Sequence, residues 1–189
     1  MIKIGILGDI GSGKSYVAKN FGYPVFNADI EVGKLYKKDR KVFNKLKKLL
    51  PKYIHLFPIN KNEISSAILA NKSNLQKIVK VVHLEIRKKM DIFLKKNINK
   101  KIVILDIPLL LENKINKKND ILVFVKSKKV DILKRLRKRK NFNSKLLNKF
   151  KNIQLPQDYK KKKAQFVIKN NFTKKSVNKS IKKILKDIL

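Results

Sequence analysis

The stretch Gly8-Asp9-Ile10-Gly11-Ser12-Gly13-Lys14-Ser15 decides the fold of this chain. It fits the pattern G-x-x-x-x-G-K-[ST], the glycine-rich phosphate-binding loop called the P-loop. The apolar run Ile2–Leu7 precedes it and predicts a short strand. Tyr16–Phe21 follows it and predicts a helix that ends near Gly22. Strand, glycine loop and helix, in that order, are the structural context that the motif requires.

The residue types of the loop explain its spacing. Gly8, Gly11 and Gly13 permit positive φ angles and let a phosphate approach the backbone, whose N–H groups then point at the anion. Lys14 supplies positive charge to the β- and γ-phosphates, and the Ser15 hydroxyl can ligate Mg²⁺. The alternative is a glycine-rich turn with a solvated lysine. The predicted ATP-binding residues here are Gly8, Gly11, Ser12, Gly13, Lys14, Ser15 and Tyr16.

The composition bounds the class of protein. A chain of 189 residues with 43% hydrophobic content can bury one core. It contains no run of 18 apolar residues, so no membrane span is predicted. Zero cysteines exclude disulfides, thiolate catalysis and a cysteine zinc site. The N-terminal apolar run leads straight into the P-loop rather than into a signal-peptide cleavage site, and we expect a cytoplasmic protein.

The net charge of +36 raises the question of nucleic-acid binding. The excess is mostly lysine and is spread along the whole chain, whereas a dedicated binder more often concentrates arginine and aromatic residues on one element. We therefore expect small-molecule substrates and no specific nucleic-acid partner, with nonspecific binding only at low salt. We expect a monomer or a weak homo-oligomer.

Two acids follow predicted strands. Asp29 comes just after Tyr23–Phe26, and Asp106 ends Lys101–Asp106. Ligands of parallel sheets bind at the carboxyl ends of strands, so both acids are expected on the same edge as the P-loop. Asp29 could accept a proton from an attacking hydroxyl or hold a metal-bound water; the alternative is an N-cap. Asp106 is a candidate for the Mg²⁺ shell, or a loop carboxylate that pairs with a lysine.

The alternation of strands and helices predicts an α/β chain with the three-layer P-loop NTPase fold. Further strands are expected at Ile121–Val125 and Ala164–Ile168, which gives a five-stranded parallel sheet. The single domain 1–189 is then expected to comprise a nucleotide-binding core (1–30, 100–126 and 164–189), a helical insertion for the acceptor (31–99) and a basic helical lid (127–163). The alternative for the lid is a pair of solvated basic helices.

Over nearly its full length the chain resembles the dephospho-coenzyme A kinase family. The resemblance is carried by several motifs in one order. They are the P-loop, the V-x-x-A-D-x pattern of Val25–Ile30, the D-x-P-L-L-x-E pattern of Asp106–Glu112, the Q-x-P-x-x-x-K pattern of Gln154–Lys160 and the F-V-I-x-N pattern of Phe166–Asn170. The P-loop alone is shared by many NTPases, but the combination is specific to this family.

The resemblance implies transfer of the ATP γ-phosphoryl group to the ribose 3′-hydroxyl of dephospho-CoA, the last step of coenzyme A biosynthesis. It implies that Asp29 contacts that hydroxyl, that Arg139 is a lid arginine near the phosphates, and that Asn170 approaches the ATP base. Asp29, Lys14 and Arg139 are the implied catalytic residues. The implied substrate-binding residues are Asp29, His83, Arg87, Pro108, Leu109, Leu110 and Glu112.

Several positions depart from the family pattern. Asp9 stands where glycine is more usual, and Leu84 replaces a proline. In the lid, Ser144 and Phe150 replace arginines, and Gln165 replaces an aspartate before the last strand. Since the P-loop and Asp29 are intact, an active enzyme is expected. The rival functions are another nucleoside- or nucleotide-type kinase and a nucleic-acid-binding P-loop NTPase.

Overall fold

The computed structural model describes residues 1–139 and 142–189, and the chain divides into two compact units. Unit 1 comprises Met1–Asn27, Asn97–Phe142 and Ile153–Leu189. Unit 2 comprises Ala28–Lys96 and Asn143–Asn152. Within the described residues, no helix combines the length and the apolar character that crossing a membrane would need.

Unit 1 is built on a parallel sheet of five strands in the order β2-β3-β1-β4-β5, which confirms the predicted α/β fold. The strands are β1 (Ile2–Gly8), β2 (Val25–Asn27), β3 (Ile102–Asp106), β4 (Ile121–Lys126) and β5 (Phe166–Lys169). Because β1 pairs with β3 on one side and β4 on the other, the loop that follows β1 emerges at the middle of the sheet edge.

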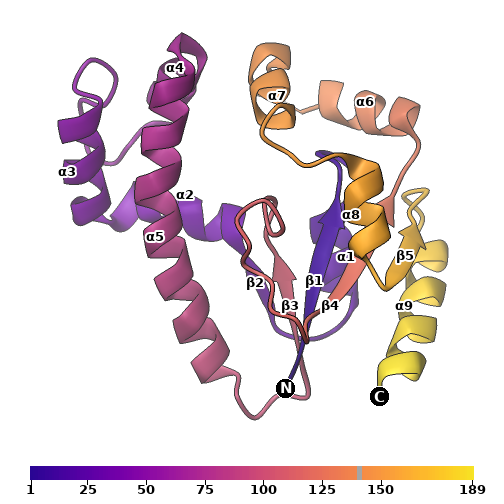
Figure 1. Ribbon diagram of the computed structural model, residues 1–189. Helices are drawn as coiled ribbons and strands as arrows, with labels where there is room; N and C mark the ends of the chain where they lie inside the picture. The colour runs from indigo at the N-terminus through magenta and orange to yellow at the C-terminus, as the bar shows by residue number, and fades with distance from the viewer. Residues whose placement is uncertain (140–141) are drawn as a thin grey trace. The chain divides into compact units, whose positions relative to one another are not determined.

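Helices cover both faces of this sheet (Figure 1). The helices of unit 1 are α1 (Lys14–Asn20), α6 (Lys129–Arg137), α8 (Gln157–Lys163) and α9 (Lys174–Ile188). α1 and α9 contact each other and the strands on one face, and α8 packs against β1 and β4 on the other. The result is the three-layer arrangement that the sequence predicts.

The core under α1 and α9 is mainly aliphatic. Ile4, Ile104 and Val123 project into it from neighbouring strands, and Val17 and Ile181 project from the two helices. Burying such side chains is the main favourable term in folding, worth about 1.5–3 kcal/mol for each large aliphatic residue. The spacing of apolar residues along α9 therefore determines which of its faces turns inward, whereas the central strand β3 is buried on both faces.

The opposite face of the sheet is closed partly by the loop after β3. β3 ends at Asp106, and residues 108–114 form turns rather than a continuing strand. A Cβ added to Gly5 would lie 2.5 Å from the Cδ2 atom of Leu110 and 3.0 Å from that of Leu122. The absence of a side chain at Gly5 therefore lets Leu110 lie directly on the sheet.

Unit 2 consists of helices. They are α2 (Ala28–Lys38), α3 (Arg40–Leu49), α4 (Lys61–Ala70), α5 (Lys72–Lys96) and α7 (Ser144–Lys151). The long helix α5 contacts α2, α3 and α4, and α7 contacts α4. At the start of α4, Asn60 and Glu63 form a capping box that satisfies free N–H groups of the first turn.

Candidate active site

The P-loop has the backbone conformation that its glycines predict. Gly8, Gly11 and Gly13 have φ angles of 142°, 85° and 91°, which favour glycine. Space is restricted as well as conformation. A Cβ on Gly8 would lie 2.6 Å from the Val125 carbonyl oxygen, and one on Gly13 would lie 2.4 Å from Asn170 Nδ2. Substitution at either position would therefore distort the loop.

The carbonyl of Ser12 is held by two side chains from other strands. Asn170 Nδ2 and Ser127 Oγ each donate a hydrogen bond of 2.9 Å to this oxygen. Asn170 directly follows β5, and Ser127 directly follows β4. Ser12 is fully buried, so the peptide between Ser12 and Gly13 has a fixed orientation. The resemblance implies a contact of Asn170 with the ATP base, and the structure shows that its side chain also braces the loop.

Lys14 starts α1 and folds back over the loop. Its Nζ donates hydrogen bonds to the carbonyl oxygens of Gly8 at 3.1 Å and Asp9 at 2.8 Å, and the residue is 9% exposed. The ammonium group is thus held beside the loop's backbone. Asp9 stands where the family more often has glycine. Its carboxylate accepts a hydrogen bond of 2.7 Å from the Ile10 N–H, so the loop's own backbone partly compensates the negative charge. Tyr16, further along α1, is exposed.

Three polar side chains meet where α1, β2 and β3 come together. Asn27 and Asp106 are register partners at the ends of β2 and β3. Asn27 Nδ2 donates to Asp106 Oδ2 at 2.5 Å and to Ser15 Oγ at 3.5 Å. Asp106 is 3% exposed. The sequence analysis predicts Ser15 and Asp106 as metal ligands but does not select Asn27. The position of Asn27 at the carboxyl end of a predicted strand could have marked it as a candidate site residue.

This cluster fits the donor set that Mg²⁺ prefers. A hydroxyl and a carboxylate are hard oxygen ligands, and Mg²⁺ usually takes only one or two carboxylates together with substrate phosphates. Among the described residues there is no group of three or more His, Cys, Asp or Glu side chains placed to hold a metal by themselves. The chemistry therefore suits a cation that arrives with a phosphate ligand better than a permanently bound one.

A cation–aromatic pair lies beside the loop. The Arg135 guanidinium of α6 lies 4.2 Å from the centre of the Phe172 ring. A Cβ on Gly13 would come within 3.3 Å of that ring. α6 also packs on the loop, since a Cβ on Gly11 would lie 3.0 Å from Leu136. Arg139, predicted as a lid arginine, is exposed just beyond the end of α6.

The loop predicted to surround the acceptor divides into outward and inward residues. Pro108 and Leu109 are partly exposed. Leu110 is 1% exposed and packs on Gly5. Glu112 forms an ion pair of 2.7 Å with Lys160. The Leu110 side chain therefore fills the core of unit 1, and the Glu112 carboxylate is already bound by another side chain.

The remaining predicted site residues belong to unit 2. Asp29 is the second residue of α2, and its side chain is exposed. His83 and Arg87 lie one helical turn apart on α5, where His83 is half-buried and Arg87 is exposed. Burial and, next, the positive charge of Arg87 lower the pKa of the His83 imidazole. The neutral form of His83 is therefore favoured.

The P-loop with its lysine, the hydroxyl–carboxylate cluster at the sheet edge and the arginines of α6 are features of the ATP-dependent kinases of the P-loop class. The sequence profile of the dephospho-CoA kinase family matches residues 2–176. The chain is 33% identical over 187 residues to a dephospho-CoA kinase of a Wolbachia from Brugia malayi, covering 96% of this chain and 95% of the relative. The chain therefore belongs to the dephospho-CoA kinase family.

Solved structures share the fold of this chain. The crystal structure of TT1252 from Thermus thermophilus matches with a TM-score of 0.81 at 25% identity, over 100% of this chain and 98% of that one. Dephospho-CoA kinase from Campylobacter jejuni matches with a TM-score of 0.63 at 19% identity, over 98% of this chain and 96% of that one. At that identity the second match supports the fold alone.

Replacing Asn170 with alanine should weaken ATP binding. The change removes one of the two hydrogen bonds that orient the Ser12 carbonyl, and a bond of this kind is worth about 1 kcal/mol, so we expect the KM for ATP to rise about fivefold. The matched control is Asn171→Ala, because the Asn171 side chain bonds to Thr173 and Ser176 at the start of α9. Steady-state kinetics that show equal ATP KM values for the two variants would contradict the bracing role.

Replacing Arg87 with glutamine should raise the pKa of His83 toward its ordinary value of 6.5, because the repulsion between two cations is removed. A lowered histidine pKa means that the unfolded chain binds the proton better, so the free energy of unfolding decreases as pH falls below about 6.5. The variant should show a weaker decrease. An NMR titration of the imidazole measures the shift; Lys88→Gln, one residue further along α5, is the control. An unchanged His83 pKa in the Arg87 variant would contradict this account.

Proposed function

We propose that this kinase transfers the γ-phosphoryl group of ATP to the ribose 3′-hydroxyl of dephospho-CoA, giving CoA and ADP. Membership of the family supports the reaction. The observation that supports ATP binding is the P-loop, in which three glycines have positive φ angles and Lys14 bonds to the loop's carbonyl oxygens. Both substrates are small molecules, and a cytoplasmic location remains a prediction.

On the ATP side, the chain contributes positioning and positive charge. The N–H groups of the loop and the first turn of α1 face the phosphates, and Lys14 moves from the Gly8 and Asp9 carbonyls to the β- and γ-phosphoryl oxygens. Arg139 contributes a guanidinium fork that can bridge two phosphoryl oxygens. These groups stabilise charge on the transferring phosphoryl group, which is the main contribution that a protein makes to this chemistry.

The residues that would hold Mg²⁺ are Ser15, through its hydroxyl, and Asp106, through its carboxylate. When bound, the ion neutralises charge on the β- and γ-phosphoryl oxygens. Asn27 keeps the Asp106 carboxylate oriented through its hydrogen bond of 2.5 Å to Oδ2. A carboxylate that is 3% exposed and held in this way loses little freedom on binding a cation.

On the acceptor side, Asp29 orients the 3′-hydroxyl and takes its proton. The hydroxyl oxygen forms a bond to the γ-phosphorus while the bond from that phosphorus to the β–γ bridging oxygen breaks, so ADP leaves with the electron pair. The proton passes to the Asp29 carboxylate. The family resemblance assigns acceptor binding to His83 and Arg87 in unit 2 and, separately, to Pro108 and Leu109 in unit 1. The neutral His83 can both donate and accept a hydrogen bond.

An acceptor panel tests this proposal. ADP release by the purified protein is measured with ATP alone and with dephospho-CoA, nucleosides, nucleotides or RNA added at physiological salt. Dephospho-CoA should stimulate release strongly and the other compounds should not. If a nucleoside or nucleotide stimulated ADP release and dephospho-CoA did not, the protein would instead be a different small-molecule kinase.

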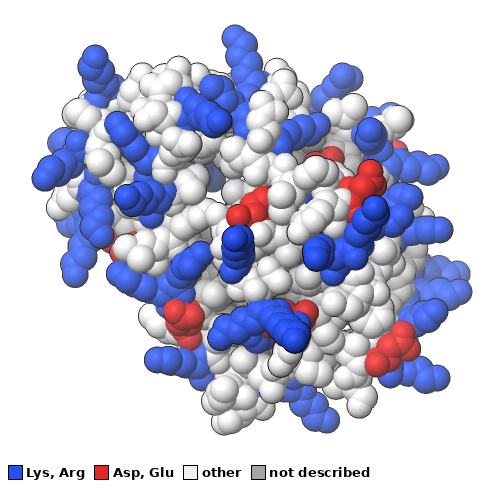
Figure 2. Space-filling model, in the orientation of Figure 1, with Lys and Arg blue, Asp and Glu red and all other residues white. Residues whose placement is uncertain are grey.

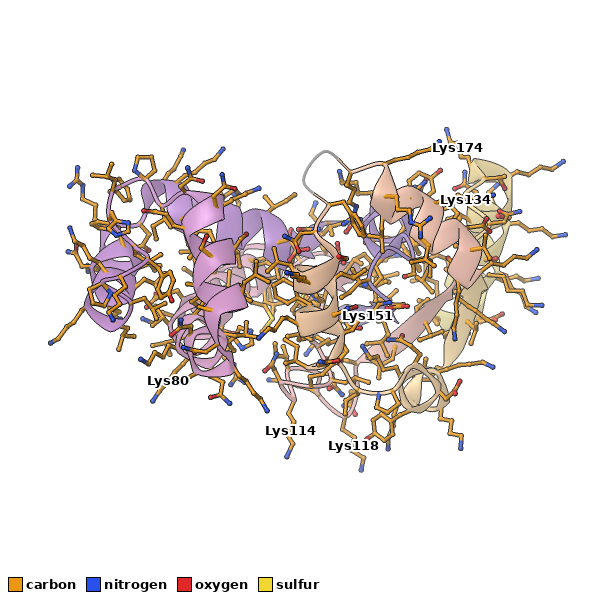
Figure 3. All side chains as sticks on the ribbon, turned by 90° about the horizontal axis from the view of Figure 1, so that it is seen from above. Lys80, Lys114, Lys118, Lys134, Lys151 and Lys174 are labelled. Carbon is orange, nitrogen blue, oxygen red and sulfur yellow. The ribbon has the colours of Figure 1, made fainter. Side chains whose placement is uncertain are left out.

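Salt-resistant stimulation by RNA would instead favour a nucleic-acid-dependent NTPase. The distribution of charge argues against that outcome. Figure 2 shows Lys and Arg side chains over the whole visible face rather than gathered on one element. In Figure 3, Lys114 and Lys118, from the segment between β3 and β4, extend away from the ribbon as solvated side chains do.

Replacing Asp29 with asparagine should lower kcat by about 10²- to 10⁴-fold, because the amide cannot accept the proton, and the KM for ATP should change little. Glu31→Gln is the matched control. It removes a carboxylate from the same first turn of α2, where Glu31 pairs with Lys34 and Lys89. Steady-state turnover near that of the wild type in the Asp29 variant would remove this residue from the mechanism.

A further inference from the structure

Lys160 and Glu112 form a buried ion pair that links two of the family motifs. Lys160 Nζ lies 2.7 Å from Glu112 Oε1. The two side chains are 1% and 9% exposed, respectively. Lys160 lies in α8, and Glu112 lies in the loop after β3, so residues far apart in the sequence are joined inside unit 1.

The same carboxylate oxygen has a second partner. The backbone N–H of Leu155 donates a hydrogen bond of 3.0 Å to Glu112 Oε1. Leu155 lies in the segment that begins at Ile153, where the chain re-enters unit 1 after α7. One oxygen therefore fastens the loop after β3 to α8 and to the segment that precedes it.

Stability alone does not explain this arrangement. Replacing a buried ion pair by apolar side chains of similar size is often neutral or stabilising, because removing two charges from water is costly. The pair is also incompletely satisfied. Glu112 Oε2 is buried, and within the part of the chain that the structure describes no donor reaches it. An unsatisfied buried oxygen adds a further cost, so a purely stabilising role is a poor account of the pair.

The loop geometry indicates what the pair achieves. Leu110 anchors the loop inward against Gly5, and Glu112 anchors it inward through Lys160. Between Asp106 and these two anchors, Pro108 and Leu109 remain partly exposed. The Leu109 carbonyl also accepts hydrogen bonds from the backbone and side chain of Asn113, which closes the turn. The anchors therefore determine which surface Pro108 and Leu109 present.

We propose that Lys160 is a positioning residue for the acceptor. By holding Glu112 inside unit 1, it fixes Pro108 and Leu109 in the arrangement that binds dephospho-CoA. This inference rests on the proposed function, since it requires those two residues to contact the acceptor. It assigns Glu112 an indirect role through the loop, in place of the direct substrate contact that the resemblance implies.

The test is Lys160→Met, which keeps a long apolar side chain and removes the ammonium. Because small misplacements at a binding site reduce catalysis strongly, kcat/KM for dephospho-CoA should fall about 10- to 100-fold. The KM for ATP should stay within about twofold, since the P-loop is braced by Ser127 and Asn170 instead. Lys162→Met, at an exposed position of the same helix, is the matched control and should match the wild type.

A second variant covers the case in which Lys160→Met does not fold, because it leaves the Glu112 charge buried and unpaired. The double variant K160M/E112Q has no buried charge at this position and should show the same selective loss for dephospho-CoA. Lys160→Arg, which keeps a positive charge, should recover part of the loss. A selective loss that Lys160→Arg partly reverses supports positioning, whereas a folded K160M or K160M/E112Q with wild-type kinetics for dephospho-CoA overturns it. If the wild-type protein shows no release of ADP dependent on dephospho-CoA, the proposed function itself has failed.

Discussion

The orientation of one peptide, between Ser12 and Gly13, is the constraint on which the nucleotide site depends. Ser127 and Asn170, which follow β4 and β5, donate hydrogen bonds to its carbonyl oxygen. The Asn170 side chain lies so close to Gly13 that a Cβ at position 13 would not fit. With its carbonyl turned into the protein, the loop can direct its N–H groups outward to an anion. Residues that follow β4 and the edge strand β5 therefore support a loop that belongs to β1.

The carboxyl ends of β2 and β3 supply a second group of polar side chains near the P-loop. The register of β2 and β3 places Asn27 beside Asp106, and the Asn27 amide also reaches Ser15 at the start of α1. This is the general rule for parallel sheets, in which ligands bind outside the carboxyl ends of the strands. The Asn27 amide donates a hydrogen bond to the buried Asp106 carboxylate and so compensates its charge, and this carboxylate is the one that we propose as a ligand of Mg²⁺.

The sequence predicts the fold well because its signals are local. The P-loop, the apolar strands and the order of the family motifs need no knowledge of tertiary contacts. Lys160 shows the limit: it lies in a densely basic stretch that suggests a solvated face, yet a single distant carboxylate makes it one of the most buried side chains. The role of Gln165 is equally hidden in the sequence. Its carboxamide oxygen accepts a hydrogen bond of 2.7 Å from the N–H of Leu122 in β4, the strand next to β5. Such roles depend on partners about 40 or more residues away, which neither periodicity nor spacing reveals.

In the proposed reaction the P-loop presents the γ-phosphoryl group directly to a sugar hydroxyl, without an intermediate carrier. The most direct measurement follows the phosphorus of ATP labelled at the γ-position through a single turnover with dephospho-CoA, with the product analysed by ³¹P NMR and chromatography. The account predicts that the label appears on the ribose 3′-oxygen of CoA in step with ADP. Label found only in inorganic phosphate, at a rate independent of dephospho-CoA, would contradict it.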